Sequence, residues 1–376
     1  IFLPLVPVVV MSLLALLITL ITSRFRKSKL LSIVLMFVVF IGLFLWSFSV
    51  NETTVNPLTG QIELFAGIAK NYPPITWFVN AVHEGNLMHL LYLSMSHLVI
   101  FGLFIYGIQG VVNYTNQQGL KQNIKKNGKP LKYQERSVLS ALVQKELKKF
   151  FSMPLYAVNA GLGPVLLMVL SIGSVFYRTQ IESVLGEMIG VGLPIEMLLM
   201  GLIGFCVAMT YTPAISLSLE GKNFWIIKSL PISAVQVMLS KIIFNLLLIV
   251  PVAIVSVLIF GFSVQIIWYN QLLLIGLIII FSFLVSSMDA VINLYMPKFD
   301  FINEVEVIKQ SAGAMLSVFG GFGLMVINGL LIYVLSNQVS LQLILLILIL
   351  ANGLLTLPFA YIVRNKSTQL FGLMKA

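Results

Sequence analysis

Charged residues are scarce in this sequence. Asp, Glu, Lys and Arg together make up 10% of the 376 residues, against roughly a quarter in a soluble globular domain. Acidic residues are the scarcer kind, with 13 against 23 basic ones, so the formal net charge is +10. Cysteine occurs once: Cys206 alone excludes an internal disulfide and a cysteine-based metal cluster. Because Cys206 lies inside an apolar run, we expect it to be a small core residue.

Several catalytic motifs are absent as well. The sequence contains no Gly-x-x-x-x-Gly-Lys-Ser/Thr phosphate loop, which excludes ATP hydrolysis by that chemistry on this chain. It has no His-Glu-x-x-His zinc motif, no Ser/His/Asp arrangement that would support nucleophilic catalysis and no acidic cluster suited to a metal ion. We therefore expect no enzymatic activity, no metal site and no cofactor on this chain.

Long apolar runs make up most of the sequence, and hydrophobic residues account for 59% of it. Runs of about 20 residues, at ~1.5 Å per helical residue, cross a hydrocarbon core of about 30 Å. We predict an all-α fold, a polytopic helical membrane protein with about nine transmembrane helices in this chain. The predicted spans are Ile1–Thr22, Leu30–Val50, Leu87–Val111, Pro154–Tyr177, Leu193–Leu217, Ile242–Phe260, Leu272–Leu294, Ala312–Leu335 and Leu341–Ile362.

The basic residues indicate how these spans are oriented. When the spans alternate in direction, all of the 23 Lys and Arg residues except Lys70 and Arg178 fall on one side. Short loops rich in Lys and Arg stay on the cytoplasmic side, so the C-terminus is expected there and Ile1 outside. Basic loops beside apolar spans also meet anionic lipid headgroups. Membrane lipids are therefore an expected partner, and nucleic acid is not.

The start of the chain suggests that a further part precedes it. The first residues lie in an apolar run with neither a basic segment before it nor a small-residue cleavage site after it, so a signal peptide is not indicated. If Ile1 lies outside, a cytoplasmic N-terminus requires an odd number of additional spans. Farther along, the outer segment between the second and third spans carries Pro73, Pro74 and Trp77, which suggest a short interfacial helix.

An amphipathic segment, Ser137–Phe151, precedes the fourth span. Its helical periodicity, with too much charge for a span, predicts a helix along the inner membrane surface, with its lysines near the headgroups. Pro154 suits the first turn of the helix that follows. A simple surface anchor and an elbow helix that opens a six-span transport unit remain equally open. The apolar face holds Val138, Leu139, Leu142, Val143, Leu147, Phe150 and Phe151, and the polar face holds Ser140, Gln144, Lys145, Lys148 and Lys149.

The loop after the fifth span has an unusual composition. Between Gly221 and Pro231 it carries apolar residues that are too many for a solvated loop and too few to cross a bilayer: Phe224, Trp225, Ile227 and Leu230. Ser233 with Gln236 then matches a capping box that starts the next helix. Such a short helix, held by two long spans, is suited to docking a soluble partner. The alternative is an interfacial helix with Trp225 in the headgroup belt.

The order of these features resembles the permease subunit of a bacterial ATP-binding-cassette (ABC) exporter of the type-2 class. The resemblance covers about residues 137–362. Two strings carry it: the elbow Lys145-Glu-Leu-Lys-Lys-Phe-Phe-Ser-Met-Pro154 and the loop Glu220-Gly-Lys-Asn-Phe-Trp-Ile-Ile-Lys-Ser-Leu-Pro-Ile-Ser233. Only the Glu-Gly-Lys-Asn-Phe-Trp string is moderately specific.

The resemblance implies a division of labour between subunits. A separate cytosolic ABC ATPase, present as two subunits, would bind ATP and Mg²⁺, and this chain would bind neither. The coupling contact with that ATPase would come from Glu220, Gly221, Lys222, Asn223, Phe224, Trp225, Ile227 and Leu230. An acidic second inner loop with Asp300, Glu304 and Glu306 would give a secondary contact. Localisation would be the bacterial cytoplasmic membrane.

The resemblance also implies a domain organisation. Residues 1–111 would be three transmembrane helices that end a first transport half, residues 112–136 a cytoplasmic linker, and residues 137–376 an elbow helix with a six-helix half. The part upstream of Ile1 would then supply three further spans, giving twelve in two halves. Some relatives carry re-entrant outer helices before the last span, for which the stretch 336–340 is too short.

Few ionisable residues lie within the predicted spans. His89 and His97 share nearly one helix face of the third span, where neutral imidazoles against a neighbouring helix are the favoured interpretation. Asp289 lies about a turn and a half from the inner end of the seventh span, so we favour hydrogen bonding at the interface over proton carriage.

The apolar pathway favours an amphipathic or hydrophobic cargo, such as a peptide or a lipid. Two other functional classes remain as alternatives. An ion-coupled secondary transporter would place acidic residues at the midplane of matching repeats, which only Asp289 approaches. A membrane scaffold or sensor without transport is the other.

Overall fold

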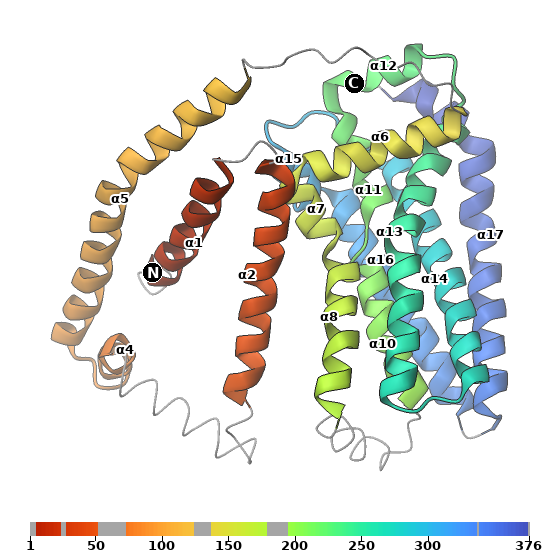
Figure 1. Ribbon diagram of the computed structural model, residues 1–376, viewed down its shortest axis with the longest axis horizontal. Helices are drawn as coiled ribbons and strands as arrows, with labels where there is room; N and C mark the ends of the chain where they lie inside the picture. Colours follow the sequence, from red (N-terminus) through yellow and green to blue (C-terminus); the bar gives the residue numbers. More distant parts are fainter. Residues whose placement is uncertain are drawn as a thin grey trace. The chain divides into compact units, whose positions relative to one another are not determined.

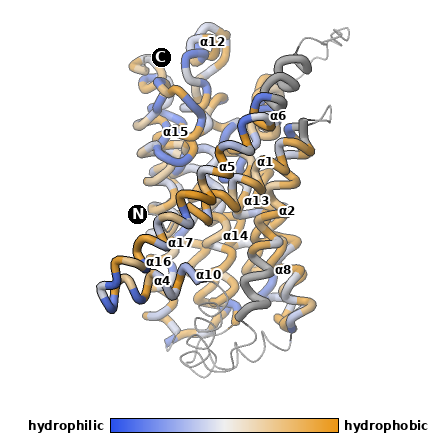
Figure 2. The backbone as a smooth tube through the Cα atoms, turned by 90° about the vertical axis from the view of Figure 1, so that its left-hand side faces the viewer, coloured by the Kyte–Doolittle hydropathy of each residue, from blue (hydrophilic) through white to orange (hydrophobic). Residues whose placement is uncertain are grey.

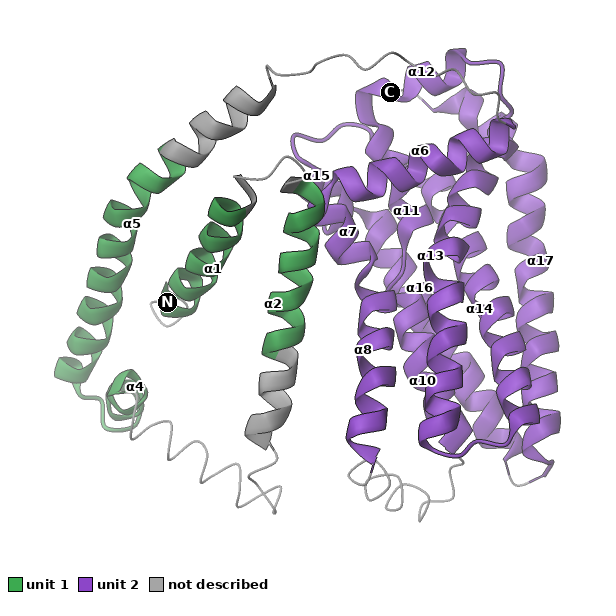
Figure 3. Cartoon of the chain, viewed as in Figure 1, with its two compact units in different colours: residues 1–132 green, residues 133–376 purple. Residues whose placement is uncertain are grey.

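The computed structural model describes residues 5–23, 28–51, 73–123, 137–178, 195–336 and 338–374. Every regular element within these ranges is a helix (Figure 1). The all-α prediction is therefore confirmed for the described residues. The chain divides into two compact units, residues 1–132 and 133–376 (Figure 3). The boundary falls inside the stretch 112–136 that was expected to be a linker.

Unit 1 contains four described helices. The α1 helix packs against α2 and α5, and α4 packs against α5. The α4 helix is the short helix predicted from Pro73, Pro74 and Trp77, and the ring of Trp77 lies 6.0 Å from that of Tyr92 on α5. The remainder of that outer segment, residues 52–72, lies outside the described residues. The helices are α1 (Leu5–Ser23), α2 (Ser28–Asn51), α4 (Pro73–His83) and α5 (Leu87–Asn123).

Unit 2 is a bundle of long helices with short helices at one end. The capping box predicted at Ser233 is present: the Gln236 amide donates to Ser233 Oγ (3.1 Å), and the Ser233 amide donates to Gln236 Oε1 (3.2 Å). The elements are α6 (Val138–Ser152), α7 (Pro154–Ala160), α8 (Leu162–Phe176), α10 (Ile195–Ala208), α11 (Thr212–Ser216), the 3₁₀ helix η1 (Ser218–Asn223), α12 (Phe224–Ser229), α13 (Ala234–Ser263), α14 (Trp268–Tyr295), α15 (Glu304–Ile308), α16 (Ala312–Leu335) and α17 (Leu341–Leu373).

Length and hydropathy make this chain a polytopic helical membrane protein. Among the described residues, six stretches are long and apolar enough to cross a membrane, and α7 with α8 forms a seventh if that bent pair is one span. Hydrophobic residues run along α13 and α14, whereas hydrophilic residues gather near α15 (Figure 2). The six stretches are Leu87–Asn113, Ile195–Ser229, Ala234–Ser263, Trp268–Tyr295, Glu304–Leu335 and Leu341–Leu373; the first two predicted spans appear as the shorter apolar helices Leu5–Ile21 and Lys29–Leu43.

Two predicted spans are not continuous helices. The span predicted for Pro154–Tyr177 is bent by 54° between α7 and α8. Pro164 has no amide hydrogen to donate to the carbonyl of Ala160, so the helix breaks within that turn. In the fifth predicted span, α10 ends at Ala208 and the separate helix α11 begins at Thr212. Pro213 has no amide hydrogen to donate to the preceding turn, so α10 does not continue through it.

The α14 helix lies at the centre of unit 2. The helices α10, α11, α13, α16 and α17 all pack against it. Its apolar side chains Leu274, Leu277 and Leu284 are almost completely buried in the main hydrophobic core. The packing of unit 2 is therefore organised around α14.

Close packing between α8 and α10 depends on Gly163. A Cβ at this position would collide with the carbonyl oxygen of Cys206 and with the Thr210 hydroxyl. A small residue is therefore needed where the two backbones meet, as at many helix contacts in membranes.

We expect Gly163→Ala to lower stability by about 1–3 kcal/mol, because the added methyl group forces α8 away from α10. The midpoint of thermal unfolding of the purified protein in detergent measures this change. Gly173→Ala on the same helix is the matched control, since nothing lies within 4 Å of its Cβ position. Equal midpoints for the two variants would show that this helix contact is not sterically limited.

Candidate functional site

The loop predicted to dock a partner is a chain of short helices between α10 and α13. After α11 the backbone passes through η1 and turns at Gly221, whose φ of +54° is a left-handed conformation that favours glycine. A Cβ at Gly221 would also approach the Phe301 ring to 3.1 Å. Gly221 therefore sets the direction in which α12 leaves the bundle.

The inner face of α12 is anchored in an aromatic cluster. Phe224 stacks on Phe299 with ring centroids 4.6 Å apart, and it meets Phe371 of α17 edge to face at 5.3 Å. Ile227, one turn later, is buried beside it. Phe224 and Ile227, which the sequence suggested as partner contacts, are thus inside the protein. A six-residue helix has little stability of its own, so this packing holds α12 in place.

The outer face of α12 carries the exposed apolar side chains. Trp225 is 63% exposed, and Ile226 and Leu230 are also exposed. Together these three residues form the outer face of α12. Ile226 was not singled out from the sequence, because apolar spacing alone does not reveal which face of so short a helix is buried. Lys222 and Asn223, just before α12, are exposed as well.

Glu220 is turned toward α6 and joins it to the loop. Lys145 Nζ lies 2.9 Å from Glu220 Oε2, and Lys149 Nζ lies 3.0 Å from Glu220 Oε1. These two lysines were expected near lipid headgroups and Glu220 at a partner contact; in the structure they form ion pairs with one another. A carboxylate this close to the bundle requires cationic partners, since an isolated charge there is costly.

A second ion pair lies deeper at the same place. Lys241 of α13 is 1% exposed, and its Nζ lies 2.7 Å from Glu146 Oε1 on α6 and 3.8 Å from Glu220 Oε1. Lys149 Nζ also donates to the carbonyl of Ser216 (3.0 Å). Burial lowers the pKa of the Lys149 ammonium, and the nearby carboxylates of Glu146 and Glu220 oppose that shift. We call these five residues the ion-pair cluster: Lys145, Glu146, Lys149, Glu220 and Lys241.

Sequence reasoning did not find the Glu146–Lys241 pair. A signal was present, because Lys241 interrupts the apolar start of a span and Glu146 interrupts the basic run of α6. Which carboxylate would meet which ammonium depends on how α6 crosses α13, and that crossing is a tertiary feature.

A hydrogen-bonded contact ties η1 to the central helix. Ser218 Oγ donates to Asn293 Oδ1 (2.7 Å), and Asn293 Nδ2 donates to the carbonyl of Pro213 (2.8 Å). The Lys298 amide in turn donates to Ser218 Oγ (3.0 Å). These bonds attach the loop to the C-terminal end of α14. The attachment point in the loop, Ser218, lies two residues before Glu220.

The acidic loop after α14 lies beside the same segment, since α15 packs against η1. Asp300 and Glu304 are exposed, while Glu306 pairs with Lys298 across 3.4 Å. Ile302, between them, is 97% exposed. The three acidic residues are therefore not equivalent: two are available to a partner, and Glu306 is engaged within the loop.

Asp289 and His97 of the predicted spans are buried, whereas His89 is partly exposed. Asp289 is completely buried and accepts a hydrogen bond from Ser317 Oγ of α16, so it links two helices inside the bundle. In unit 1, His97 is buried with Nδ1 2.7 Å from the Leu93 carbonyl of its own helix, and His89 lies edge to face with Tyr92. The described residues contain no group of three or more His, Cys, Asp or Glu that could hold a metal ion.

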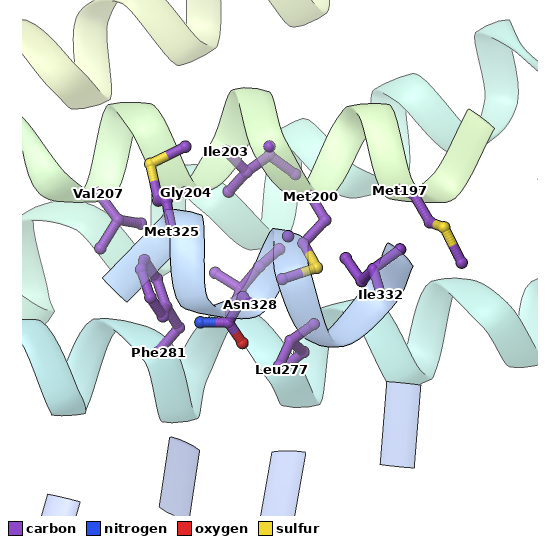
Figure 4. A pocket seen from close by; sticks show the side chains of 13 residues that line it. Met197, Met200, Ile203, Gly204, Val207, Leu277, Phe281, Met325, Asn328 and Ile332 are labelled. Carbon is purple, nitrogen blue, oxygen red and sulfur yellow. The ribbon is translucent and has the colours of Figure 1, made fainter. Parts of the chain in front are cut away.

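An apolar cavity of about 90 Å³ lies between α10, α14 and α16 (Figure 4). The amide of Asn328 in its wall is already paired with Asn352 of α17, each side-chain nitrogen donating to the other's oxygen (3.1 and 2.7 Å). The cavity is therefore suited to apolar groups, and its flexible methionines can adapt to different shapes. Its labelled lining residues are Met197, Met200, Ile203, Gly204, Val207, Leu277, Phe281, Met325, Asn328 and Ile332.

Comparison with known proteins identifies a family. The sequence profile of a family described as "Membrane protein of 12 TMs" matches residues 4–362. No curated protein and no solved structure matches the chain.

We expect Lys241→Met to destabilise the protein by about 3–5 kcal/mol, because it leaves buried carboxylate charge uncompensated. The double variant Lys241→Met with Glu146→Leu should recover most of this loss, since the pair is then replaced by apolar side chains. Thermal unfolding in detergent measures both.

Lys298→Met is the matched control. It breaks the more exposed Lys298–Glu306 pair and should change stability by only about 0–1 kcal/mol. If Lys241→Met and Lys298→Met had equal effects, the ion-pair cluster would not be the anchor of α6.

Proposed function

This chain belongs to the family of membrane proteins with 12 transmembrane segments, and we propose that it is the permease subunit of an ATP-driven exporter. The observation that carries the proposal is the outer face of α12. It presents Trp225, Ile226 and Leu230 away from the bundle, while the inner face is fixed by aromatic packing. Exposed aromatic and aliphatic anchors on a rigid support are what a protein interface requires.

The proposed partner is a cytosolic ABC ATPase, with two subunits per complex. ATP and Mg²⁺ bind on that partner, because this sequence has no phosphate loop. This chain therefore contributes the membrane passage and no enzymatic step. Twelve spans in two six-helix halves give one docking helix for each ATPase subunit, and the family's description matches that number of spans.

The proposed orientation puts α12 in the cytoplasm. Lys222, Lys228 and the basic residues of α6 all belong to loops at this end, and such loops stay on the inner side. The C-terminus follows α17 to the same side. The membrane is then the bacterial cytoplasmic membrane.

In the proposed mechanism, closure of the ATPase subunits on ATP displaces α12. The ion-pair cluster transmits this displacement to α6 and α13, and the Ser218–Asn293 bond transmits it to α14. Since α14 contacts five neighbouring helices, the bundle responds as a unit and alternates between inward and outward openings. Ion pairs suit this role because their attraction falls off gradually with distance, so the partners stay associated while the helices shift.

The proposed cargo is amphipathic or hydrophobic, such as a peptide or a lipid. The cavity between α10, α14 and α16 is lined mainly by apolar side chains, and the one amide in its wall is already paired. A sugar or a small ion would find no hydrogen-bonding partners there.

The acidic loop offers a proposed secondary contact for the ATPase. Asp300 and Glu304 are exposed beside Ile302, so the loop combines an apolar side chain with negative charge. Glu306 supports the loop through Lys298 and also accepts from the Ile302 amide (3.3 Å).

One observation favours a second candidate, an ion-coupled secondary transporter. Asp289 is completely buried between α14 and α16 with Ser317 as its partner, and buried carboxyl groups of this kind serve as proton sites in transporters. Transport along a proton gradient by the protein without any ATPase, abolished by Asp289→Asn, would select this candidate over the exporter.

We expect Trp225→Ala to weaken binding of the ATPase by about 2 kcal/mol or more, roughly a thirtyfold loss of affinity. Co-purification of a candidate cytosolic ABC ATPase with the permease measures the loss. Thermal unfolding should be unchanged, because the side chain is exposed.

Trp268→Ala is the matched control for this experiment. Trp268 is 70% exposed at the first turn of α14. Its substitution removes the same side chain from the surface at a position outside α12. Equal loss of ATPase with both variants would point to a nonspecific effect, and unchanged binding with Trp225→Ala would place the contact elsewhere.

Orientation is tested with single cysteines in a Cys206→Ala background. A thiol reagent that does not cross membranes should label Ser340→Cys in intact cells and should label Lys222→Cys only after the cells are opened. Both positions are exposed, so access depends only on the side of the membrane. The reverse pattern would put α12 outside and rule out a cytosolic partner.

A further inference from the structure

The last turn of α17 reaches α12 (Figure 1). The helix continues beyond its predicted end at Ile362 to Leu373, past the charged Arg364 and Lys366. In the C-terminal turn, residues 370–374, Phe371 and Met374 are buried. Buried apolar residues after a charged stretch indicate that this turn packs against another element.

That element is α12. Phe371 meets the Phe224 ring at 5.3 Å, and Lys228 Nζ donates to the Met374 carbonyl at 3.1 Å. The same ammonium lies 6.0 Å from the centre of the Phe224 ring, within the range of a cation–π contact. The contact between α12 and α17 therefore combines aromatic packing with a hydrogen bond.

The contact is concentrated in these few side chains. A cleft of about 170 Å³ lies between α12, the start of α13 and α17, and its lining includes Lys228 and Phe371 together with Ile227, Ile232 and Thr368. Because packing beside the cleft is loose, the contacts of Phe371 with Phe224 and of Lys228 with the Met374 carbonyl attach α12 to α17. A short helix without such a contact frays readily.

The α17 helix is a suitable support for α12. It packs along α14 and also contacts α13 and α16, and its amide residue Asn352 pairs with Asn328 of α16. A displacement of the C-terminal turn would therefore reach the wall of the apolar cavity, which Asn328 lines.

We propose that the C-terminal turn of α17 positions α12 and transmits its displacement directly to the cavity-lining helices. The inference rests on the proposed function, because it concerns the helix that docks the ATPase. It assigns to Phe371 and Lys228 a role in coupling that is separate from partner binding. The outer face of α12 binds the ATPase; its inner contact with α17 carries the movement.

The first arm of the test uses the full chain in lipid nanodiscs without any ATPase. Hydrogen exchange at the amides of α12 should become about tenfold faster in Phe371→Ala, because the helix loses its contact with α17 while Phe224 keeps its stack on Phe299. Leu373→Ala is the matched control: it removes an apolar side chain from the same turn, but Leu373 is 72% exposed. Phe371→Leu should keep most of the protection.

The second arm uses the complex with the ATPase. Phe371→Ala and Lys228→Met should keep ATPase binding and ATP hydrolysis, while cargo moved per ATP hydrolysed falls about tenfold. A merely structural role for Phe371 would lower binding and transport together, and would leave this ratio unchanged. Leu373→Ala should leave the ratio at its original value.

The two arms separate the possible failures. Unchanged exchange in Phe371→Ala would overturn the positioning role, and an unchanged transport ratio would overturn the transmitting role. If exchange responds but the unaltered protein binds no ATPase, the exporter function itself is wrong, and the coupling role falls with it.

Discussion

In unit 2, a buried salt bridge joins α6 to α13. Lys241 of α13 and Glu146 of α6 are both almost completely shielded from solvent, with 2.7 Å between Nζ and Oε1. Removing either partner would leave a charge where water cannot reach it, so the geometry of the two helices is strongly specified. Glu220 brings the docking loop into the same cluster through Lys145 and Lys149. The position of α6, the start of α13 and the entry to α12 are therefore set together.

This arrangement gives α12 two different faces. Its inner face is fixed by the stack of Phe224 on Phe299 and by the contact with Phe371, while Trp225 points out. Side chains that are neighbours in sequence therefore differ in role: Phe224 attaches α12 to the bundle, and Trp225 is exposed.

The spans show how a membrane bundle accommodates polar groups. Asp289 bonds to Ser317, Asn328 to Asn352, and Asn270 donates to Glu196 at 2.9 Å. Each bond joins two helices inside the described bundle. In a medium without water, such groups find partners on neighbouring helices, and the resulting contacts fix helix rotation. The apolar cavity lies among these bonds, and its walls are held by them.

The sequence alone determined the class of the protein and the main local features. Hydropathy and length give helical spans because the bilayer leaves the backbone no other partners, and local hydrogen bonding gives the capping box at Ser233. Tertiary structure decided the rest. The sequence could not tell that Glu220 faces α6, that Phe224 and Ile227 point inward while Ile226 points outward, or that the end of α17 supports α12. Hydropathy depends on each residue by itself, whereas these outcomes depend on which helices meet and at what angle, so only the packed bundle contains them.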